Sequence, residues 1–244
     1  MTTSQQQSGL LIRAAAKAQV FVGDLNQPTL TSDDDHHLTR VLRLRAGESV
    51  IAADGSGKWR PCTYVGLGTP LEPIGNIVEE AIPEHPTVVA FAPVKGDRPE
   101  WAFSKLVELG VDIIVLLMCD RSVVKWGDER GERHRLRLDK LAVSAAGQSR
   151  RVTLPALVGP MTLSEAKAAY SNLTLGQIGG DQPTSNLGAI AIGPEGGWSD
   201  AELALGLPTV SLGSTVLRAE TATVAAGQLL TQLRSGDVVA NHAS

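Results

Sequence analysis

Two glycine-bearing segments near the C-terminus hold the residues whose types and spacing best fit a chemical role. The segment GPEGG at 193–197 places Glu195 among glycines, and LGSTVLRAET at 212–221 contains Arg218 and Glu220. Because glycine has no Cβ, such loops allow main-chain N–H and C=O groups to contact a ligand directly. Arg218 would face an anionic or carboxylate group there. The alternative is a local ion pair between Arg218 and Glu220 that only holds the loop.

Both loops follow strand-like segments, GAIAI at 188–192 and TVSLG at 209–213. Ser199 and Glu202 have the S-x-x-E spacing of a capping box, which predicts a helix directly after the first loop. In an open, mostly parallel sheet, ligands bind at the carboxyl ends of the strands. The two loops therefore predict one shared pocket at that edge of the sheet.

A third strand end, PVKGDRPEW at 93–101, carries Lys95, Asp97 and Arg98 just before an amphipathic helix. A basic edge of this kind suits phosphate contacts. The alternative is ordinary solvated turn chemistry, with Asp97 near a helix cap.

The first 83 residues are predicted to form a separate domain of short β segments. SVIAAD and KWRPCTYVGL, at 49–54 and 58–67, flank a glycine-bearing turn and predict a hairpin. Between the first strand and this hairpin we expect a helix capped near Thr31, with three apolar residues on one face: Leu38, Val41 and Leu42. The proline-rich PEHPT at 83–87 is the best linker in the chain. The predicted domains are therefore 1–83 and 84–244.

The second domain alternates buried strands with helices. Apolar runs such as TVVAFAPV at 87–94 and VDIIVLLMC at 111–119 lie between amphipathic segments, among them a long basic helix from about 129 to 149. Continuous apolar strands that alternate with helices indicate an α/β fold with a mostly parallel sheet covered on both faces.

Composition narrows the class of protein. The chain has 244 residues, of which 43% are hydrophobic and 20% charged, and neither a membrane-length apolar run nor a signal layout is present, so we expect a cytoplasmic protein. Cys62 and Cys119 lie in apolar surroundings, and the histidines are not grouped at metal spacings, so we expect no disulfide and no metal site. DGSGKW at 54–59 lacks the first glycine and the final Ser or Thr of a phosphate loop, which disfavours a nucleotide-binding protein.

The charge is distributed unevenly. A net charge of −4 argues mildly against nucleic acid as a partner. However, HHLTRVLRLR at 36–45 contains arginines and no acid, and further basic residues gather between 130 and 151. A bipolar surface would permit RNA binding, whereas a solvated helix face with ion pairs is an equal alternative for 130–140.

IGPEGGWSDAEL at 192–203 followed by LGSTVLRAETA at 212–222 resembles the SPOUT superfamily, specifically the bacterial small-subunit (16S) ribosomal RNA uridine-N3 methyltransferase family. Further matches follow in the family's order through nearly the whole chain: HHLTRVLRLRAGE, DGSG, KGDRPEWAFSKLVELGV and AAGQSRR.

This resemblance implies a PUA-like, RNA-binding β-barrel in 1–83 and a dimerising SPOUT domain with a deep trefoil knot in 84–244. It implies a homodimer that uses S-adenosylmethionine as methyl donor and acts on small-subunit ribosomal RNA, free or in the assembled 30S subunit. The implied cofactor-binding residues are Gly176, Gly193, Pro194, Glu195, Gly196, Gly197, Leu212, Gly213, Val216, Leu217, Arg218 and Thr221. We expect RNA contacts from Arg40, Arg43, Arg45, Lys95, Arg98, Arg121 and Arg150.

The implied reaction requires a uracil base that is unstacked and held with its N3 edge toward the methyl group. Positioning alone supplies much of the rate of such a transfer. A cation near the uracil carbonyl oxygens favours the N3-deprotonated base, so we expect Arg218 to be catalytic, with Glu220 orienting it or assisting proton removal. Two alternatives remain: methylation of another RNA at a ribose 2′-hydroxyl or on a transfer RNA, and a non-catalytic RNA-binding assembly factor.

Overall fold

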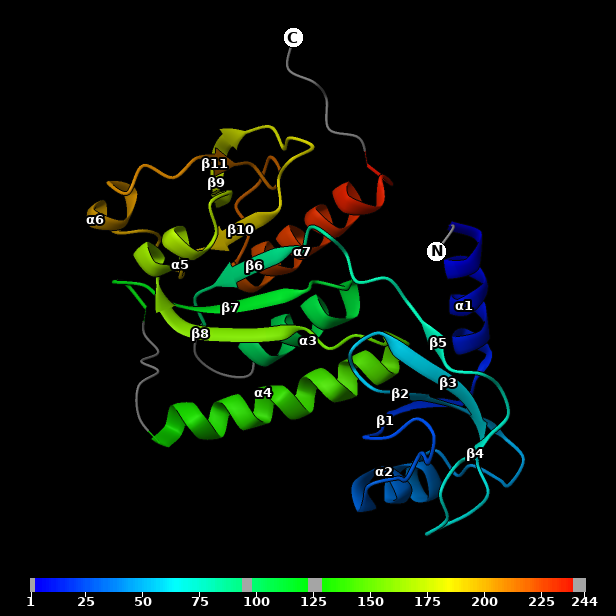
Figure 1. The fold of residues 1–244 in the computed structure, drawn as a ribbon. Coiled ribbons are helices and arrows are strands. Elements are labelled where there is room, and N and C mark those ends of the chain that lie inside the picture. Colours follow the sequence, from blue (N-terminus) through cyan, green and yellow to red (C-terminus); the bar gives the residue numbers. More distant parts are fainter. Residues whose placement is uncertain (1–2, 94–97, 123–128, 239–244) are drawn as a thin grey trace. The chain divides into compact units, whose positions relative to one another are not determined.

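A computed structural model describes residues 3–93, 98–122 and 129–238, and the chain divides into two compact units (Figure 1). The first unit comprises Met1–Pro83 and Val143–Leu154, and the second comprises Glu84–Ala142 and Pro155–Ser244. The segment 143–154 therefore belongs to the first unit, although the sequence placed it in the second domain. Its main chain explains why, because Gly57 donates to the carbonyl of Val152 and Leu154 donates to that of Gly55.

The first unit is built on a small sheet with the order β1-β2-β3-β4, on which β5 pairs with β3. Its strands are β1 (Ala18–Phe21), β2 (Ser49–Ala53), β3 (Lys58–Thr63), β4 (Glu72–Pro73) and β5 (Val78–Glu79). The predicted hairpin is confirmed, because β2 and β3 pair antiparallel with Ala53 opposite Trp59. Helix α1 (Thr3–Ala15), which the sequence pattern did not indicate, precedes β1.

The helix expected after Thr31 is shorter than predicted. Thr31 caps α2 (Ser32–His36), but the chain then continues as a π-helical turn, η1 (His37–Val41). Leu38 is buried as expected, whereas Val41 is 60% exposed and the neighbouring Leu42 is 44% exposed. The prediction of one apolar face was wrong for these two residues, because a π-helical turn holds more residues than the 3.6 of an α-helix and changes which side chains align.

The second unit contains a parallel sheet with the strand order β11-β9-β10-β6-β7-β8 (Figure 1). Its strands are β6 (Val88–Phe91), β7 (Ile113–Met118), β8 (Ala156–Thr162), β9 (Leu173–Asp181), β10 (Ala189–Ile192) and β11 (Thr209–Val210). Every neighbouring pair is parallel, which confirms the predicted sheet type. All residues of β6 and β10 are buried, as expected for continuous apolar strands covered on both faces.

Helices α3 (Arg98–Leu109) and α7 (Ala219–Ser235) pack against each other, and α7 also contacts β6 and β10. Helix α5 (Leu163–Ala169) lies next to β8, and the one-turn helix α6 (Asp200–Leu203) follows the first glycine loop. The long basic helix is α4 (Glu129–Gln148).

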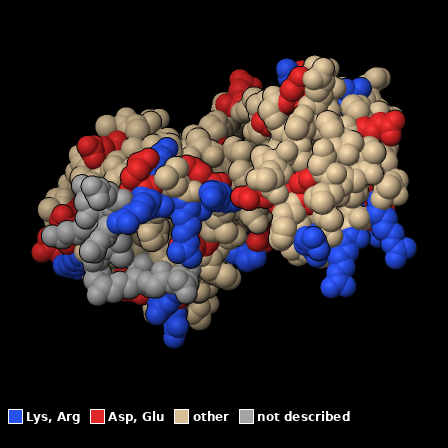
Figure 2. Space-filling view, turned by 90° about the horizontal axis from the view of Figure 1, so that it is seen from below, with Lys and Arg blue, Asp and Glu red and all other residues tan. Residues whose placement is uncertain are grey.

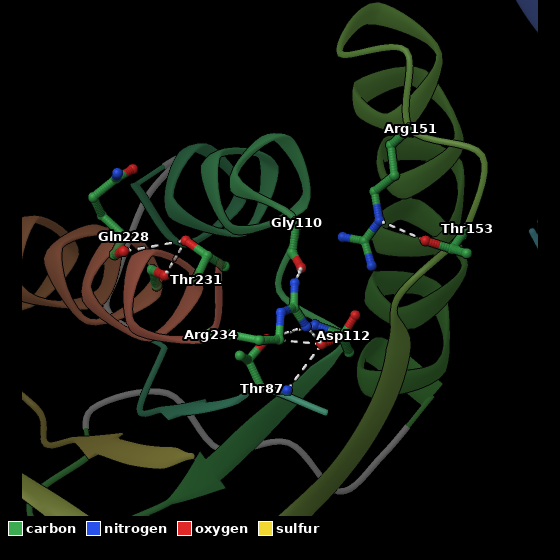
Figure 3. A network of polar contacts seen from close by, with 9 residues as sticks. Thr87, Gly110, Asp112, Arg151, Thr153, Gln228, Thr231 and Arg234 are labelled. Carbon is green, nitrogen blue, oxygen red and sulfur yellow. Dashed lines mark hydrogen bonds and ion pairs between the residues drawn. The ribbon is translucent and has the colours of Figure 1, made fainter. Parts of the chain in front are cut away.

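The end of α7 is fixed at the amino end of the sheet by Arg234 (Figure 3). Its guanidinium pairs with Asp112 and donates to the carbonyl of Gly110 at 3.2 Å. Asp112 in turn accepts from the main-chain N–H of Thr87 at 2.8 Å, directly before β6. Because this end of α7 is fixed, the position of its first turn at the opposite edge of the sheet is fixed as well.

Candidate functional site

A pocket of about 620 Å³ lies in the second unit at the carboxyl end of β10, beside the middle of β9. Its walls come from the glycine loop 193–197, the second loop 212–218, residues 176–178 of β9 and the first turn of α7. The volume falls within the range of about 300–1,000 Å³ that small-molecule sites occupy. The sheet thus places the two loops on one cavity, where the strand-end pattern predicted it.

Most predicted cofactor residues form this wall. The lining includes Gly176, Gly193, Pro194, Glu195, Gly197, Leu212, Gly213, Val216, Leu217 and Arg218. Gly196 and Thr221 are not among the lining residues. Gly196 faces Arg121 instead, because a Cβ added to Gly196 would lie 3.3 Å from the Cβ of Arg121. Gln177 and Ile178 lie in the segment 176–180, and Thr215 and Ala219 lie in the loop 212–221, both of which the resemblance implied as cofactor walls. Outside these segments the wall contains four further residues: Ile192, Trp198, Leu203 and Ala222. Their only signal was that they neighbour the loops in sequence.

The glycine loop needs glycine for two separate reasons. Gly197 has φ of 69° and its N–H donates to the carbonyl of Pro194 at 2.8 Å, which closes a tight turn. A Cβ on Gly193 would lie 3.0 Å from the ring of Trp198, so a side chain at this position would push the ring away from the loop. The loop is therefore fixed by its own turn and by an aromatic wall of the pocket.

Arg98 links the two loops through its guanidinium. Its Nη1 lies 3.3 Å from Glu195 Oε1 and 3.7 Å from Glu220 Oε1. The side chain of Glu220 is only 12% exposed, and its Oε2 is buried with no hydrogen-bond partner among the described residues. Glu220 thus sits behind the wall with one oxygen paired and the other available to accept a hydrogen bond or a proton.

Arg218 is the exposed N-cap of α7, with no side-chain hydrogen bond to the helix. A cation at this end is unfavourable, because the helix dipole places partial positive charge there. Within the described residues Arg218 forms no ion pair; the partner of Glu220 is Arg98 and not Arg218. The loop-holding ion pair considered from sequence is therefore absent, and the arginine lines the pocket at an energetic cost to its helix.

The arginines expected to contact RNA occupy different environments. Arg40, Arg43 and Arg45 are exposed in the first unit, where Figure 2 shows basic side chains on the face that carries α2. Arg121 donates to the carbonyl of Gly196 at 3.1 Å, and Arg98 is engaged with Glu195 and Glu220. Lys95 lies outside the described residues.

Arg150 has a structural task in the first unit. With φ of 61°, it donates from Nη2 to the carbonyl of Ala16 at 2.8 Å and from Nη1 to that of Gly147 at 3.1 Å. Burial lowers the pKa of this guanidinium. These carbonyls occupy donors on both Nη atoms, so Arg150 has a structural role in the first unit, and its RNA contact stays a prediction.

The thiols of Cys62 and Cys119 are free and buried, and burial raises the pKa of Cys62 to about 11 and that of Cys119 to about 12. In the described part of the chain no group of three or more His, Cys, Asp or Glu residues could hold a metal ion. Among the helices that the structure describes, none is both long and apolar enough to cross a membrane.

Comparisons with known proteins match two domain families to this chain, and the longer match includes the segment 143–154. Residues 82–231 match the RNA methyltransferase domain family, and residues 30–70 match the RNA methyltransferase PUA domain. The ribosomal RNA small subunit methyltransferase E of Synechocystis is 33% identical over 85% of this chain and 74% of its own length. The protein of the same name from Bacillus subtilis is 27% identical over 86% of this chain and 92% of its own. The crystal structure of the Neisseria gonorrhoeae methyltransferase of that name, bound to S-adenosyl methionine, is similar with a TM-score of 0.71 and 25% identity, over 88% of this chain and 97% of that chain.

Proposed function

Because the chain belongs to the RNA methyltransferase family, we propose that it methylates N3 of a specific uridine in small-subunit ribosomal RNA with S-adenosylmethionine as donor. The observation that carries this proposal is the pocket between the two glycine loops, where Arg218 is exposed without an ion-pair partner among the described residues. The relatives' names supply the RNA class, and the charge arrangement of the pocket supports the choice of a uracil N3.

We further propose that the two loops belong to a deep trefoil knot and that the first unit closes into a β-barrel. The strand order supports a threaded chain, since β10 is inserted between β9 and β6. The sheet of the first unit, with β5 paired on β3 beside β4, supports a curved sheet. We also propose a homodimer that acts in the cytoplasm on the RNA, free or within the 30S subunit.

The pocket wall suits S-adenosylmethionine, which when bound supplies an electrophilic methyl group. Main-chain groups of Gly193, Gly213 and Gly176 line it without side chains, and a Cβ on Gly176 would crowd Ile192 at 2.6 Å and Leu212 at 3.3 Å. Apolar surface for an adenine ring comes from Ile192, Leu212 and Leu217.

In the proposed mechanism Arg218 holds the uracil carbonyl oxygens and stabilises the negative charge that develops when N3 loses its proton. We propose that Glu220 assists proton removal from behind the pocket wall, because its buried Oε2 has no hydrogen-bond partner among the described residues. Arg98, which reaches both Glu220 and Glu195, holds this carboxylate in place. Bound S-adenosylmethionine would supply the methyl group, so that its S–CH3 bond would break as the N3–CH3 bond forms, with the thioether as leaving group.

The test of the function is mass spectrometry of ribosomal RNA from cells with and without this gene. We expect one N3-methyluridine of the small subunit to disappear on deletion and to return with a plasmid copy. Loss of a ribose 2′-O-methyl group or of a transfer RNA modification would contradict the proposed target, and an unchanged modification map would contradict the activity.

We propose that Arg40, Arg43 and Arg45 contact RNA phosphates. Arg40→Glu combined with Arg45→Glu should weaken RNA binding about tenfold or more and flatten its salt dependence, by about 0.7–0.9 in the log–log slope for each lost contact. Arg43, which has a φ of 53°, stays unchanged so that the backbone turn at this residue is not altered. The measurement is filter binding of a ribosomal RNA fragment at several salt concentrations.

The matched control is Lys17→Glu, which reverses an exposed cation of the same unit outside the arginine segment. It should leave the salt slope near that of the unmodified chain. S-adenosylmethionine affinity, measured by calorimetry, should not change in either variant. If Lys17→Glu weakened RNA binding as much as the double arginine variant, the effect would come from the overall charge of the unit and not from a contact site.

A further inference from the structure

Glu202 is a buried carboxylate whose contacts exceed the needs of a helix cap. It is 7% exposed and belongs to α6, a helix of only four residues. Its Oε2 accepts from the main-chain N–H of Ser199 at 2.7 Å, which is the expected capping bond. Its Oε1 accepts from the main-chain N–H of Asp120 at 3.1 Å, in the turn that follows β7. A single side chain thus joins two strand ends that are distant in the sequence.

Other contacts join the same two segments. Ser199 Oγ is hydrogen-bonded to the carboxylate of Asp120, and Arg121 donates to the carbonyl of Gly196 at 3.1 Å. The turn is itself closed, because Ser122 donates to the carbonyl of Cys119 at 2.9 Å. The turn 119–122 therefore lies directly behind the glycine loop whose other side lines the pocket.

The chain contains a second capping box of the same type that lacks these cross-links. Thr162 and Glu165 start α5 with the same reciprocal bonds, and Glu165 Oε2 accepts from the N–H of Thr162 at 2.7 Å. Glu165 is exposed, and its described hydrogen bonds are all with Thr162. The burial and the bond to Asp120 are thus specific to the box beside the pocket.

We propose that the turn 119–122 braces the glycine loop for cofactor binding, with Glu202 as the positioning residue. A loop held in its binding conformation does not lose that freedom again when a ligand arrives, so affinity rises without any direct contact. Glu202 itself touches no ligand: Trp198 and Leu203, but not Glu202, are wall residues. The inference rests on the proposed use of S-adenosylmethionine in this pocket.

The experiment compares Glu202→Gln with its matched control Glu165→Gln in the full chain, by calorimetric titration with S-adenosylmethionine and by thermal unfolding. In Glu202→Gln the amide nitrogen replaces one of the two carboxylate acceptors, so the side chain can no longer accept from both Ser199 N–H and Asp120 N–H. We expect the Kd to rise about tenfold in Glu202→Gln and to stay unchanged in Glu165→Gln. At saturating donor the methylation kcat should stay near its original value while KM for the donor rises.

Equal Kd values for S-adenosylmethionine in the two variants would overturn the proposal, and Glu202 would then serve only as the capping residue of α6. If Glu202→Gln does not fold, Arg121→Ala carries the test, because Arg121 is exposed and its loss leaves the core intact. A two- to threefold higher Kd in Arg121→Ala would support the brace, and an unchanged Kd would overturn it. Failure of the unmodified chain to bind S-adenosylmethionine at all would instead contradict the proposed function.

Discussion

Replacing Arg218 with alanine should lower the rate of methyl transfer by about 100-fold or more, with the affinity for S-adenosylmethionine nearly unchanged. Removing one group that stabilises developing negative charge costs about 10²–10³ in kcat in comparable sites. Arg218 forms no ion pair or helix-capping bond within the described residues, so its removal should not unfold the loop. Single-turnover methylation of small-subunit RNA with saturating donor measures the rate, and calorimetry measures the affinity.

Two controls separate charge stabilisation from packing. Arg218→Lys keeps the charge but loses the planar pair of donors, so its rate should lie between those of the unmodified chain and Arg218→Ala. The residual rate of Arg218→Ala should recover at alkaline pH, because hydroxide removes the N3 proton without help from the arginine. Full methylation by Arg218→Ala with unchanged donor affinity would refute the assigned role.

Gly180→Ala should destabilise the second unit and weaken binding of the donor at least tenfold. A Cβ on Gly180 would lie 2.7 Å from the carbonyl carbon and 2.8 Å from the nitrogen of Val210, both of which are main-chain atoms of β11. Main-chain atoms cannot rotate away, so β9 and β11 must separate and the bond from Ser211 N to Asp181 O weakens. Overpacking of this kind costs about 1–3 kcal/mol. Because β11 leads into the loop 212–218, the pocket wall should move with it.

The matched control is Gly23→Ala, which adds the same methyl group where no atom lies within 4 Å and φ is not positive. Its free energy of unfolding should change by less than about 0.5 kcal/mol. Differential scanning calorimetry reports stability, and titration with S-adenosylmethionine reports the pocket. If Gly180→Ala melts and binds like the unmodified chain, the close approach of β9 and β11 does not position the second loop.

Much of the local structure followed from the sequence because it depends on neighbours along the chain. The capping boxes at Thr162 and Ser199 place donor and acceptor within one helical turn, so their spacing sufficed. The buried strands were visible as continuous apolar runs, and parallel pairing follows when such runs alternate with helices. The prediction of one α-helix after Thr31 was wrong at Val41, because the spacing of apolar residues does not distinguish an α-helical turn from a π-helical turn.

The pocket was predicted in outline for a related reason. Strand-end loops of a parallel sheet lie on one edge, so Gly193 and Gly213 were expected to share a cavity even before the strand order was known. The charges were not predictable in the same way. Sequence proximity left a pair between Arg218 and Glu220 open as an alternative, whereas the structure pairs Glu220 with Arg98 from another helix.

The sequence by itself thus determined the sheet type, the two glycine loops and the residue types available to them, because these follow from spacing and backbone chemistry. Only the tertiary structure decided which charged side chains form ion pairs with each other. The strand order β9-β10-β6-β7 brings the end of β7 behind the glycine loop and Arg98 beside α7. The tertiary structure also brings the main-chain N–H of Asp120 to Glu202 and the carbonyl of Ala16 to Arg150. Ion pairs and buried hydrogen bonds form between whichever groups the fold places within about 3–4 Å, and that placement depends on the order of the strands rather than on distance along the chain.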